Sequence, residues 1–205
     1  MNWCRTLGYY LIYPLCRLAL LLTHPVYHVR GRENLPEGPY VLCCNHSSGS
    51  DPFWVIFAVR PKKVFRFLAK IEFSRMPVVG ALMHAFGVIF VDRGHHDTAA
   101  VDRAIADFRS GDQLMIFPEG TRVKPGRHVP AKCGAIQMAS ACGVPVVPMY
   151  LTQNKRLFRP LYAVIGKPYY PIPVGETRSR EEMKALAAEL MAHIYEMGEA
   201  ASCGK

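Results

Sequence analysis

A histidine and an aspartate, His46 and Asp51, lie five residues apart in a short polar turn. A nearby carboxylate can hold an imidazole in one tautomer and favour its protonated form, so this pair could take a proton from a hydroxyl group. The turn also holds three serines, but the sequence has no Gly-x-Ser-x-Gly segment to present one of them as a nucleophile. We therefore predict that His46 is a general base, that Asp51 orients it, and that the substrate supplies the attacking hydroxyl.

A second polar segment, Phe-Pro-Glu-Gly-Thr-Arg, ends an apolar run at residues 117–122. Turn amides together with an arginine fork could hold a phosphate dianion. Arg93, which follows another apolar run, could add a second positive charge, and Lys70 a third, although Lys70 could equally be a solvated surface lysine. Glu119 could hold the arginines or the acceptor hydroxyl in place. The residues predicted to bind substrate are Lys70, Arg93, Glu119, Gly120, Thr121 and Arg122.

These segments together resemble the glycerophospholipid acyltransferase family, and especially its 1-acylglycerol-3-phosphate O-acyltransferase branch. The first block of that family reads Asn-His-x-x-x-x-Asp, and its third reads Phe-Pro-Glu-Gly-Thr-Arg. The matching segments, in family order, are Asn45–Asp51, Gly87–Arg93, Phe117–Arg122 and Val144–Met149. The resemblance extends from about Gly31 to Leu151. Because the order and spacing of all four blocks agree, it is more specific than the His/Asp pair alone.

The resemblance implies transfer of a fatty acyl group to the free hydroxyl of 1-acylglycerol-3-phosphate, which gives phosphatidic acid. The donor would be a thioester, either acyl-CoA or acyl-carrier protein, and no cofactor is expected. In the family, the arginines matching Arg93 and Arg122 are associated with the glycerol-3-phosphate end of the acceptor. A glycerol-3-phosphate acyltransferase is the alternative within this class, although Thr121 matches the lysophosphatidate branch better.

Two further classes compete with this interpretation. A non-catalytic membrane-surface protein that binds anionic lipid would also explain a basic chain with an apolar start, but it would not need the His/Asp pair. A metal-dependent hydrolase would need a ligand cluster. Pro25 separates His24 from His28, and the pair at 95–96 has no His-x-Glu context, so we expect no metal site.

The first residues are strongly apolar, and this favours contact with a membrane. Leu7 to Leu22 is nearly all apolar or aromatic, but Pro14 breaks its helical register and Arg17 lies within it. A spanning helix needs about 20 apolar residues, so we expect this segment to lie in one leaflet; a plain N-terminal core helix is the alternative. The 205 residues then divide into a membrane-associated helical segment, 1–23, and one acyltransferase domain, 24–205.

Charge and cysteine content restrict the partners and the compartment. A formal net charge of +9 suits nucleic acid or an anionic membrane surface. The basic residues are scattered without interleaved aromatic residues, which favours the membrane and argues against nucleic acid. Seven cysteines, an odd number without Cys-x-x-Cys spacing, indicate reduced thiols. Cys43 and Cys44 are read as small core residues rather than as a catalytic thiol. We expect a peripheral or monotopic protein at the cytoplasmic face of the cell membrane.

Short β-branched runs alternate with helical segments, which predicts a single α/β domain with a mixed central sheet flanked by helices. The predicted strands are Val26–Arg30, Tyr40–Cys44, Lys63–Ala69, Val88–Asp92, Gln113–Phe117, Val146–Leu151 and Tyr162–Ile165. The predicted helices are one that begins at Asp51, Asp97–Arg109, Lys132–Cys142, and one that begins at Ser179 with a Ser179/Glu182 capping box. Strand ends in an α/β sheet can bring distant polar segments together.

Several apolar residues could have a role besides packing. An acyl groove could be lined by Phe53, Trp54, Phe57 and residues from Met76 to Phe86. Packing in the hydrophobic core would explain these side chains equally well. Lys132 and Gly134 are expected to anchor the loop after residue 122 rather than to touch substrate.

Overall fold

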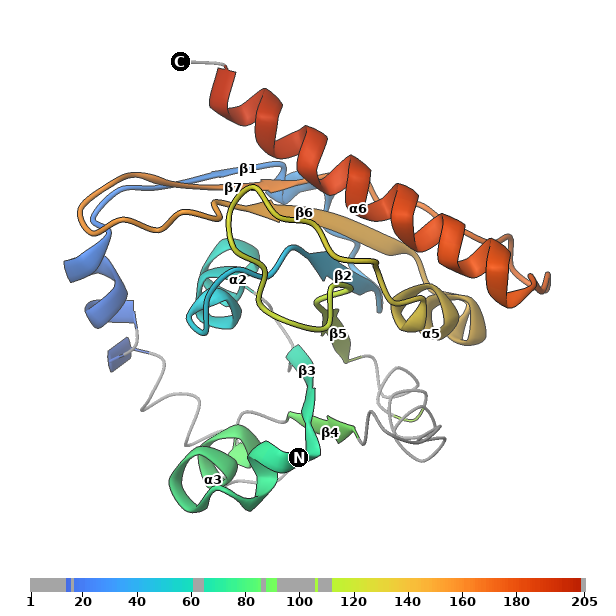
Figure 1. Ribbon diagram of the computed structural model, residues 1–205, viewed down its shortest axis with the longest axis horizontal. Coiled ribbons are helices and arrows are strands. Elements are labelled where there is room, and N and C mark those ends of the chain that lie inside the picture. Colours follow the sequence, from blue (N-terminus) through green and yellow to red (C-terminus); the bar gives the residue numbers. More distant parts are fainter. Residues whose placement is uncertain are drawn as a thin grey trace.

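A seven-stranded sheet forms the centre of the protein (Figure 1). The computed structural model describes residues 14, 15, 17–60, 65–85, 88–91, 106 and 112–203. The strands are β1 (Tyr27–Arg30), β2 (Val41–Cys44), β3 (Phe65–Lys70), β4 (Ile89–Val91), β5 (Gln113–Ile116), β6 (Val146–Leu151) and β7 (Leu161–Ile165). All seven predicted strands are therefore confirmed, with ends that differ by at most two residues. The predicted ends at Lys63 and Asp92 lie outside the described residues.

The sheet is mixed, as the sequence predicted. Its order is β1-β7-β6-β2-β5-β3-β4, and every neighbouring pair is parallel except β6 and β7. Strand β2 lies between β5 and β6, and all four of its residues are buried. A parallel strand covered on both faces has no solvent side, which explains the uninterrupted apolar run before Asn45.

Helices cover both faces of the sheet (Figure 1). The described helices are α2 (Asp51–Val59), α3 (Pro77–Ala85), α5 (Gly134–Cys142) and α6 (Arg180–Cys203), with 3₁₀ turns η1 (Arg32–Asn34) and η2 (Ile71–Arg75). Alternate residues of β2 serve the two faces: Val41 and Cys43 pack with α5 and α6, whereas Leu42 and Cys44 pack with α2. The core thus consists of two apolar layers, one on each side of β2.

The predicted ends of α6 and α5 rest on identifiable hydrogen bonds. Ser179 and Glu182 form the expected capping box, with the Ser179 N–H donating to Glu182 Oε2 at 2.8 Å and the Glu182 N–H to Ser179 Oγ at 3.2 Å. Helix α5 begins at Gly134, two residues later than predicted, and the N–H of Lys132 is bonded to Pro118 O at 2.8 Å in the preceding loop. Gly143 ends it at φ 61°.

The predicted helix at residues 97–109 lies outside the described part of the chain except for residue 106, which is helical. Near the N-terminus, residues 14, 15 and 17–23 are helical. None of the helices in the described ranges combines the length and apolar character needed to cross a membrane. The leaflet-bound segment at 1–23 stays a prediction, since residues 1–13 and residue 16 are outside these ranges.

Candidate active site

The chain leaves β2 at Asn45, and the side chain of this residue fixes the position of the turn that follows. Asn45 Nδ2 donates to Leu151 O at 2.9 Å, and Asn45 Oδ1 accepts from the Leu151 N–H at 2.8 Å. Both partners are backbone groups at the end of β6, and Asn45 is only 1% exposed. A buried amide that exchanges two hydrogen bonds with a strand end is a rigid support. The backbone of His46, the next residue, is therefore held in a fixed position relative to the sheet.

His46 and Asp51 are in direct contact. Nδ1 of His46 lies 3.0 Å from Asp51 Oδ2, and the Asp51 side chain is completely buried. An ionised carboxylate can only accept, so Nδ1 carries the proton and Nε2 is left with its lone pair. The imidazole stacks on the ring of Phe117, with centroids 4.0 Å apart, and keeps 18% of its side-chain surface exposed. This arrangement can hold the imidazole in one tautomer at the edge of the sheet.

The turn holds Asp51 with backbone donors as well. Its Oδ2 accepts from the N–H of Ser47 at 2.6 Å and from the N–H of Ser48 at 2.7 Å. Asp51 is also the first residue of α2, where the helix dipole favours a negative charge. The expected fold-back of Asp51 onto His46 is thus produced by a tight turn that places three donors around one oxygen.

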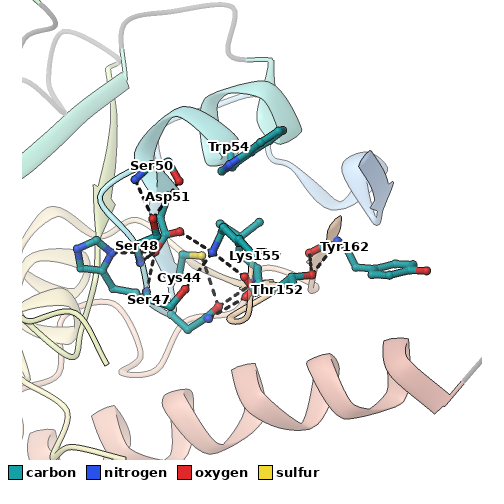
Figure 2. Close-up of polar contacts among 12 residues, drawn as sticks. Cys44, Ser47, Ser48, Ser50, Asp51, Trp54, Thr152, Lys155 and Tyr162 are labelled. Carbon is teal, nitrogen blue, oxygen red and sulfur yellow. Dashed lines mark hydrogen bonds and ion pairs between the residues drawn. The ribbon is translucent and has the colours of Figure 1, made fainter. Parts of the chain in front are cut away.

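Lys155 completes the surroundings of Asp51, and the sequence analysis missed it. Its Nζ lies 2.7 Å from Asp51 Oδ1, and it donates to Ser47 Oγ at 2.9 Å and Thr152 O at 2.6 Å (Figure 2). The Lys155 side chain is 7% exposed. Buried lysines are rare unless paired, but no sequence pattern links a lysine after β6 to an aspartate 104 positions earlier. Only the pairing of β2 with β6 brings them together.

These contacts keep Asp51 ionised. Burial by itself raises the pKa of a carboxyl group, but the hydrogen bond from His46 and the charge of Lys155 outweigh it, so the pKa of Asp51 lies below its ordinary value. The side chain is therefore negative at neutral pH. It can keep the His46 imidazole oriented and stabilise the imidazolium that forms when the ring takes a proton.

Among the residues that the structure describes, no serine or cysteine near His46 is arranged as a nucleophile. Ser47 Oγ accepts from Lys155, and the Ser48 and Ser50 hydroxyls lie 3.0 Å from each other. Cys44 is fully buried in β2, and burial raises the pKa of its thiol well above the ordinary value. The expectation that Cys44 and its neighbour Cys43 are core residues is confirmed.

Glu119, from the second polar segment, reaches the turn of His46. Its Oε2 accepts from the His46 N–H at 2.5 Å, and its Oε1 accepts from the Tyr195 hydroxyl of α6. Burial raises the pKa of Glu119, although hydrogen bonds from Tyr195 and His46 counteract this. Glu119 is 4% exposed and joins three elements. Its observed contacts are with the backbone of His46 and with Tyr195, a residue without any sequence signal, so Glu119 supports the position of His46.

The rest of the second segment lies beside the first. Gly120 has φ 64°, a left-handed conformation that favours glycine, and a Cβ there would come within 2.8 Å of the Lys132 side chain. Lys132 therefore packs on this turn, as expected of an anchoring residue, and the expectation that it does not touch substrate stays a prediction. Arg122 is exposed, and its Nη1 lies 3.9 Å from the point that a Cβ on Gly49 would occupy. The guanidinium and the His46 turn thus share one surface.

The other predicted substrate-binding residues differ in how the structure places them. Thr121 is exposed next to Arg122. Lys70 ends β3 at the same edge of the sheet, but it is 48% exposed, and its Nζ lies 3.5 Å from Glu72 Oε1. Arg93 lies outside the described residues. The roles predicted for all of these residues, and for His46 and Asp51, stay predictions.

The residues proposed for an acyl groove divide into two groups. Trp54 is 1% exposed and belongs to the apolar layer under α2, and Phe57 packs against the same layer. On η2 and α3, by contrast, apolar side chains reach solvent, with Val78 80% and Met76 46% exposed. Core packing therefore accounts for Trp54, whereas the α3 side chains remain available for an apolar ligand.

Comparison with known proteins agrees with this geometry. The family model described as Acyltransferase matches residues 26–152. The chain is 36% identical over 133 residues to a 1-acyl-sn-glycerol-3-phosphate acyltransferase of Borreliella burgdorferi, covering 63% of this chain and 52% of that protein. It is 27% identical over 175 residues to the Bacillus subtilis protein of the same name, covering 82% and 86%.

A solved structure gives the same fold. The crystal structure of the 1-acyl-sn-glycerophosphate (LPA) acyltransferase PlsC from Thermotoga maritima superposes with a TM-score of 0.68 at 24% identity, covering 95% of this chain and 81% of that one. The chain spans about half the length of the Borreliella relative, 52%. The family match covers most of the chain and includes both polar segments. The chain therefore belongs to the acyltransferase family.

Proposed function

We propose that the protein transfers a fatty acyl group from a thioester to the free hydroxyl of 1-acylglycerol-3-phosphate, forming phosphatidic acid for phospholipid synthesis. The observation that carries this proposal is the His46 ring, whose Nδ1 is held by the buried Asp51 carboxylate while no serine or cysteine in the described turn faces it as a nucleophile. The names of the relatives support the acceptor. The donor is acyl-CoA or acyl-carrier protein.

In the proposed reaction, Nε2 of His46 takes the proton from the acceptor hydroxyl as its oxygen attacks the thioester carbonyl carbon. A new C–O bond forms, the tetrahedral intermediate collapses, and the C–S bond breaks. The imidazolium then returns the proton to the departing thiolate. Asp51, kept ionised by its contact with Lys155, stabilises the imidazolium between these two proton transfers.

Arg122 is proposed to bind the phosphate of the acceptor. It is exposed, and its guanidinium lies next to Gly49 in the same turn as the base. A planar guanidinium can donate two hydrogen bonds to a phosphate, and this would hold the acceptor hydroxyl near His46. Arg93 and Lys70 are proposed as further positive contacts on the acceptor.

We further propose that the protein acts at the cytoplasmic face of the cell membrane, attached peripherally or monotopically. The acceptor keeps its own acyl chain in the leaflet, so the enzyme must meet it there. The N-terminal helix exposes leucines, with Leu15 68% and Leu22 66% exposed, and this supports attachment. Cys43 and Cys44 are free thiols buried in β2, which fits a reducing compartment.

Product analysis tests the function directly. The purified protein would be offered 1-acylglycerol-3-phosphate, glycerol-3-phosphate and a neutral lysolipid, each with acyl-CoA and with acyl-carrier protein. Phosphatidic acid from the first acceptor is the expected product. A preference for glycerol-3-phosphate would move the protein to the alternative branch, and binding of anionic lipid without any product would make it a lipid-binding protein.

Arg122→Ala is expected to raise the KM for the phosphorylated acceptor by at least about tenfold, because hydrogen bonds to charged groups contribute about 1.5–3 kcal/mol. The KM for the thioester should change little. Steady-state kinetics with each substrate varied in turn would measure both. Arg127→Ala, an exposed arginine in the same loop, is the matched control. A rise confined to the KM of the donor would show that Arg122 does not bind the acceptor phosphate.

A further inference from the structure

Two separate segments expose apolar side chains on one side of the protein. On the N-terminal helix, Leu15, Leu18 and Leu22 are spaced i, i+3 and i+7, which places them on one face, while Leu20 points to the core layer under α2. In the connection from β6 to β7, Leu157 is 63% exposed and Phe158 is 71% exposed. Exposed side chains of this size in a group usually mark an interaction surface.

The two segments are joined by a hydrogen bond. The Phe158 N–H donates to Thr23 O at 2.7 Å, at the end of the helix. Figure 1 shows the turn between β6 and β7 next to this helix, on the left of the view. Leu22 precedes Thr23, and Leu157 precedes Phe158, so the apolar groups are neighbours. We call Leu15, Leu18, Leu22, Leu157 and Phe158 the docking face.

Phe158 has an unusual backbone conformation for its type. It is the third residue of a tight turn closed by the Arg159 N–H and Arg156 O at 3.1 Å, and its φ is 62°. Glycine or asparagine is usual at such a position, and a bulky residue there is strained. The turn therefore exposes an aromatic side chain at a position whose backbone conformation glycine would adopt with less strain. Strain of this kind is found where the side chain has a function.

Positive charges surround the docking face. Arg156 and Arg159 flank its two loop residues, and Arg17 lies on its helix; none of the three pairs with a carboxylate within the described ranges. Arg17 also lines a pocket with Arg32 and Arg60, whose other walls include Trp54 and Phe57. Arginines around apolar and aromatic groups match the boundary between lipid phosphates and acyl chains.

The geometry points to a membrane-inserting turn: we infer that Leu157 and Phe158, together with the leucines of the N-terminal helix, dock in the outer part of an anionic phospholipid leaflet. The inference rests on the proposed acyltransferase function and names its partner surface. The same β6–β7 connection carries Lys155, which holds Asp51. Lys155 precedes Leu157 by only two positions in the chain. Docking of Leu157 and Phe158 would therefore bring the His46 turn close to the lipid surface that contains the acceptor.

Vesicle binding of the full chain with the changes Leu157→Ser and Phe158→Gly tests the inference. Glycine accepts φ 62°, so the turn should keep its shape while both apolar side chains are lost. Sedimentation with phosphatidylcholine vesicles containing phosphatidylglycerol is expected to show binding at least about tenfold weaker than that of the parent protein. Val174→Ser, 69% exposed before α6, is the matched control and should bind normally. Binding of the double variant within about twofold of the control would overturn the inference.

A second measurement separates docking from catalysis. With a short-chain, water-soluble acceptor, the double variant should retain normal turnover, whereas its turnover of acceptor embedded in vesicles should fall by about tenfold or more. Loss on both acceptors in a folded variant would assign the turn to the catalytic unit and overturn the docking role. Absence of product from the parent protein would instead refute the proposed function and leave the binding result valid.

Direct insertion can be followed with Phe158→Trp. On addition of the same vesicles, the tryptophan emission should shift to shorter wavelength and be quenched by brominated acyl chains, after subtraction of the parent spectrum. An unchanged emission would contradict insertion. If the face is covered by a second copy of the chain, size-exclusion chromatography would show a dimer that Phe158→Gly dissociates without a change in vesicle binding, and this would also overturn the inference.

Discussion

Replacing His46 with alanine is expected to reduce turnover by about 10²–10⁴, the usual contribution of a positioned general base. The physical reason lies in the contacts of the ring. Nδ1 is occupied by Asp51, so Nε2 is the atom available to accept the hydroxyl proton. No described serine or cysteine in the turn is placed to substitute for it. The KM values should change little, because the base acts on a proton that moves only during the reaction.

The measurement is kcat with saturating donor and acceptor, combined with an unfolding curve for each variant. His193→Ala, on an exposed part of α6, is the matched control and should leave kcat unchanged. Asp51→Asn should also lower kcat strongly, because an amide can hold the wrong tautomer of His46. Near-normal turnover in a folded His46→Ala protein would rule out the proposed chemistry.

Replacing Lys155 with methionine is expected to cost about 3–5 kcal/mol of stability, because it leaves the Asp51 carboxylate buried with an unbalanced charge. Methionine retains most of the apolar stem, so the loss reports mainly the ammonium group. Lys155 contacts Asp51, Ser47 and Thr152, and the side chain is almost completely buried. Denaturant unfolding would measure the effect. Lys167→Met, at an exposed position, should change stability by less than about 0.5 kcal/mol.

The pH dependence gives this prediction a specific sign. Because the pKa of Asp51 is lowered in the folded protein, its stabilising contribution is present above the unfolded pKa of about 3.9 and is lost as the pH falls through the folded value. Without Lys155, its charge and its hydrogen bond no longer lower the pKa of Asp51, so the folded pKa rises. Acid unfolding of Lys155→Met should therefore occur at a higher pH than in the parent protein.

A double-mutant cycle distinguishes a role through Asp51 from a general packing role. If Lys155 acts by balancing Asp51, Lys155→Met should destabilise the Asp51→Asn protein much less than it destabilises the parent. Full additivity would mean that Lys155 stabilises the loop independently of Asp51. The same cycle in kcat would show whether Lys155 positions the base, since Asp51→Asn should remove most of the effect of Lys155→Met on the rate.

Local sequence was enough to predict most elements of this fold. The seven strands are short apolar runs, and the ends of α5 and α6 carry a glycine and a capping box that act within a few residues. The meeting of His46 with Asp51 is also local, because a five-residue turn brings them together. Structural features that depend only on residues close together in the chain can be predicted from the order and spacing of those residues.

The remaining features depend on partners that are distant in sequence. Lys155 reaches Asp51 only because β6 pairs with β2, and Tyr195 reaches Glu119 only because α6 packs over the sheet. The bond from the N–H of Lys132 to Pro118 O likewise joins two segments that are not adjacent in the sequence. The sequence gives no sign that Phe158 differs from other loop residues, because its positive φ and its hydrogen bond to Thr23 O are properties of the folded chain.

The sequence alone thus determined the acyltransferase blocks, the His46/Asp51 pair and the strands that carry them, because each depends on residue type and short spacing. Tertiary structure alone decided the charge balance around Asp51, the support of His46 by Glu119, and the joining of two apolar segments into one face. The physical reason is that burial and ion pairing depend on distances in space. Those distances are fixed by strand order and helix packing, which residue spacing does not encode.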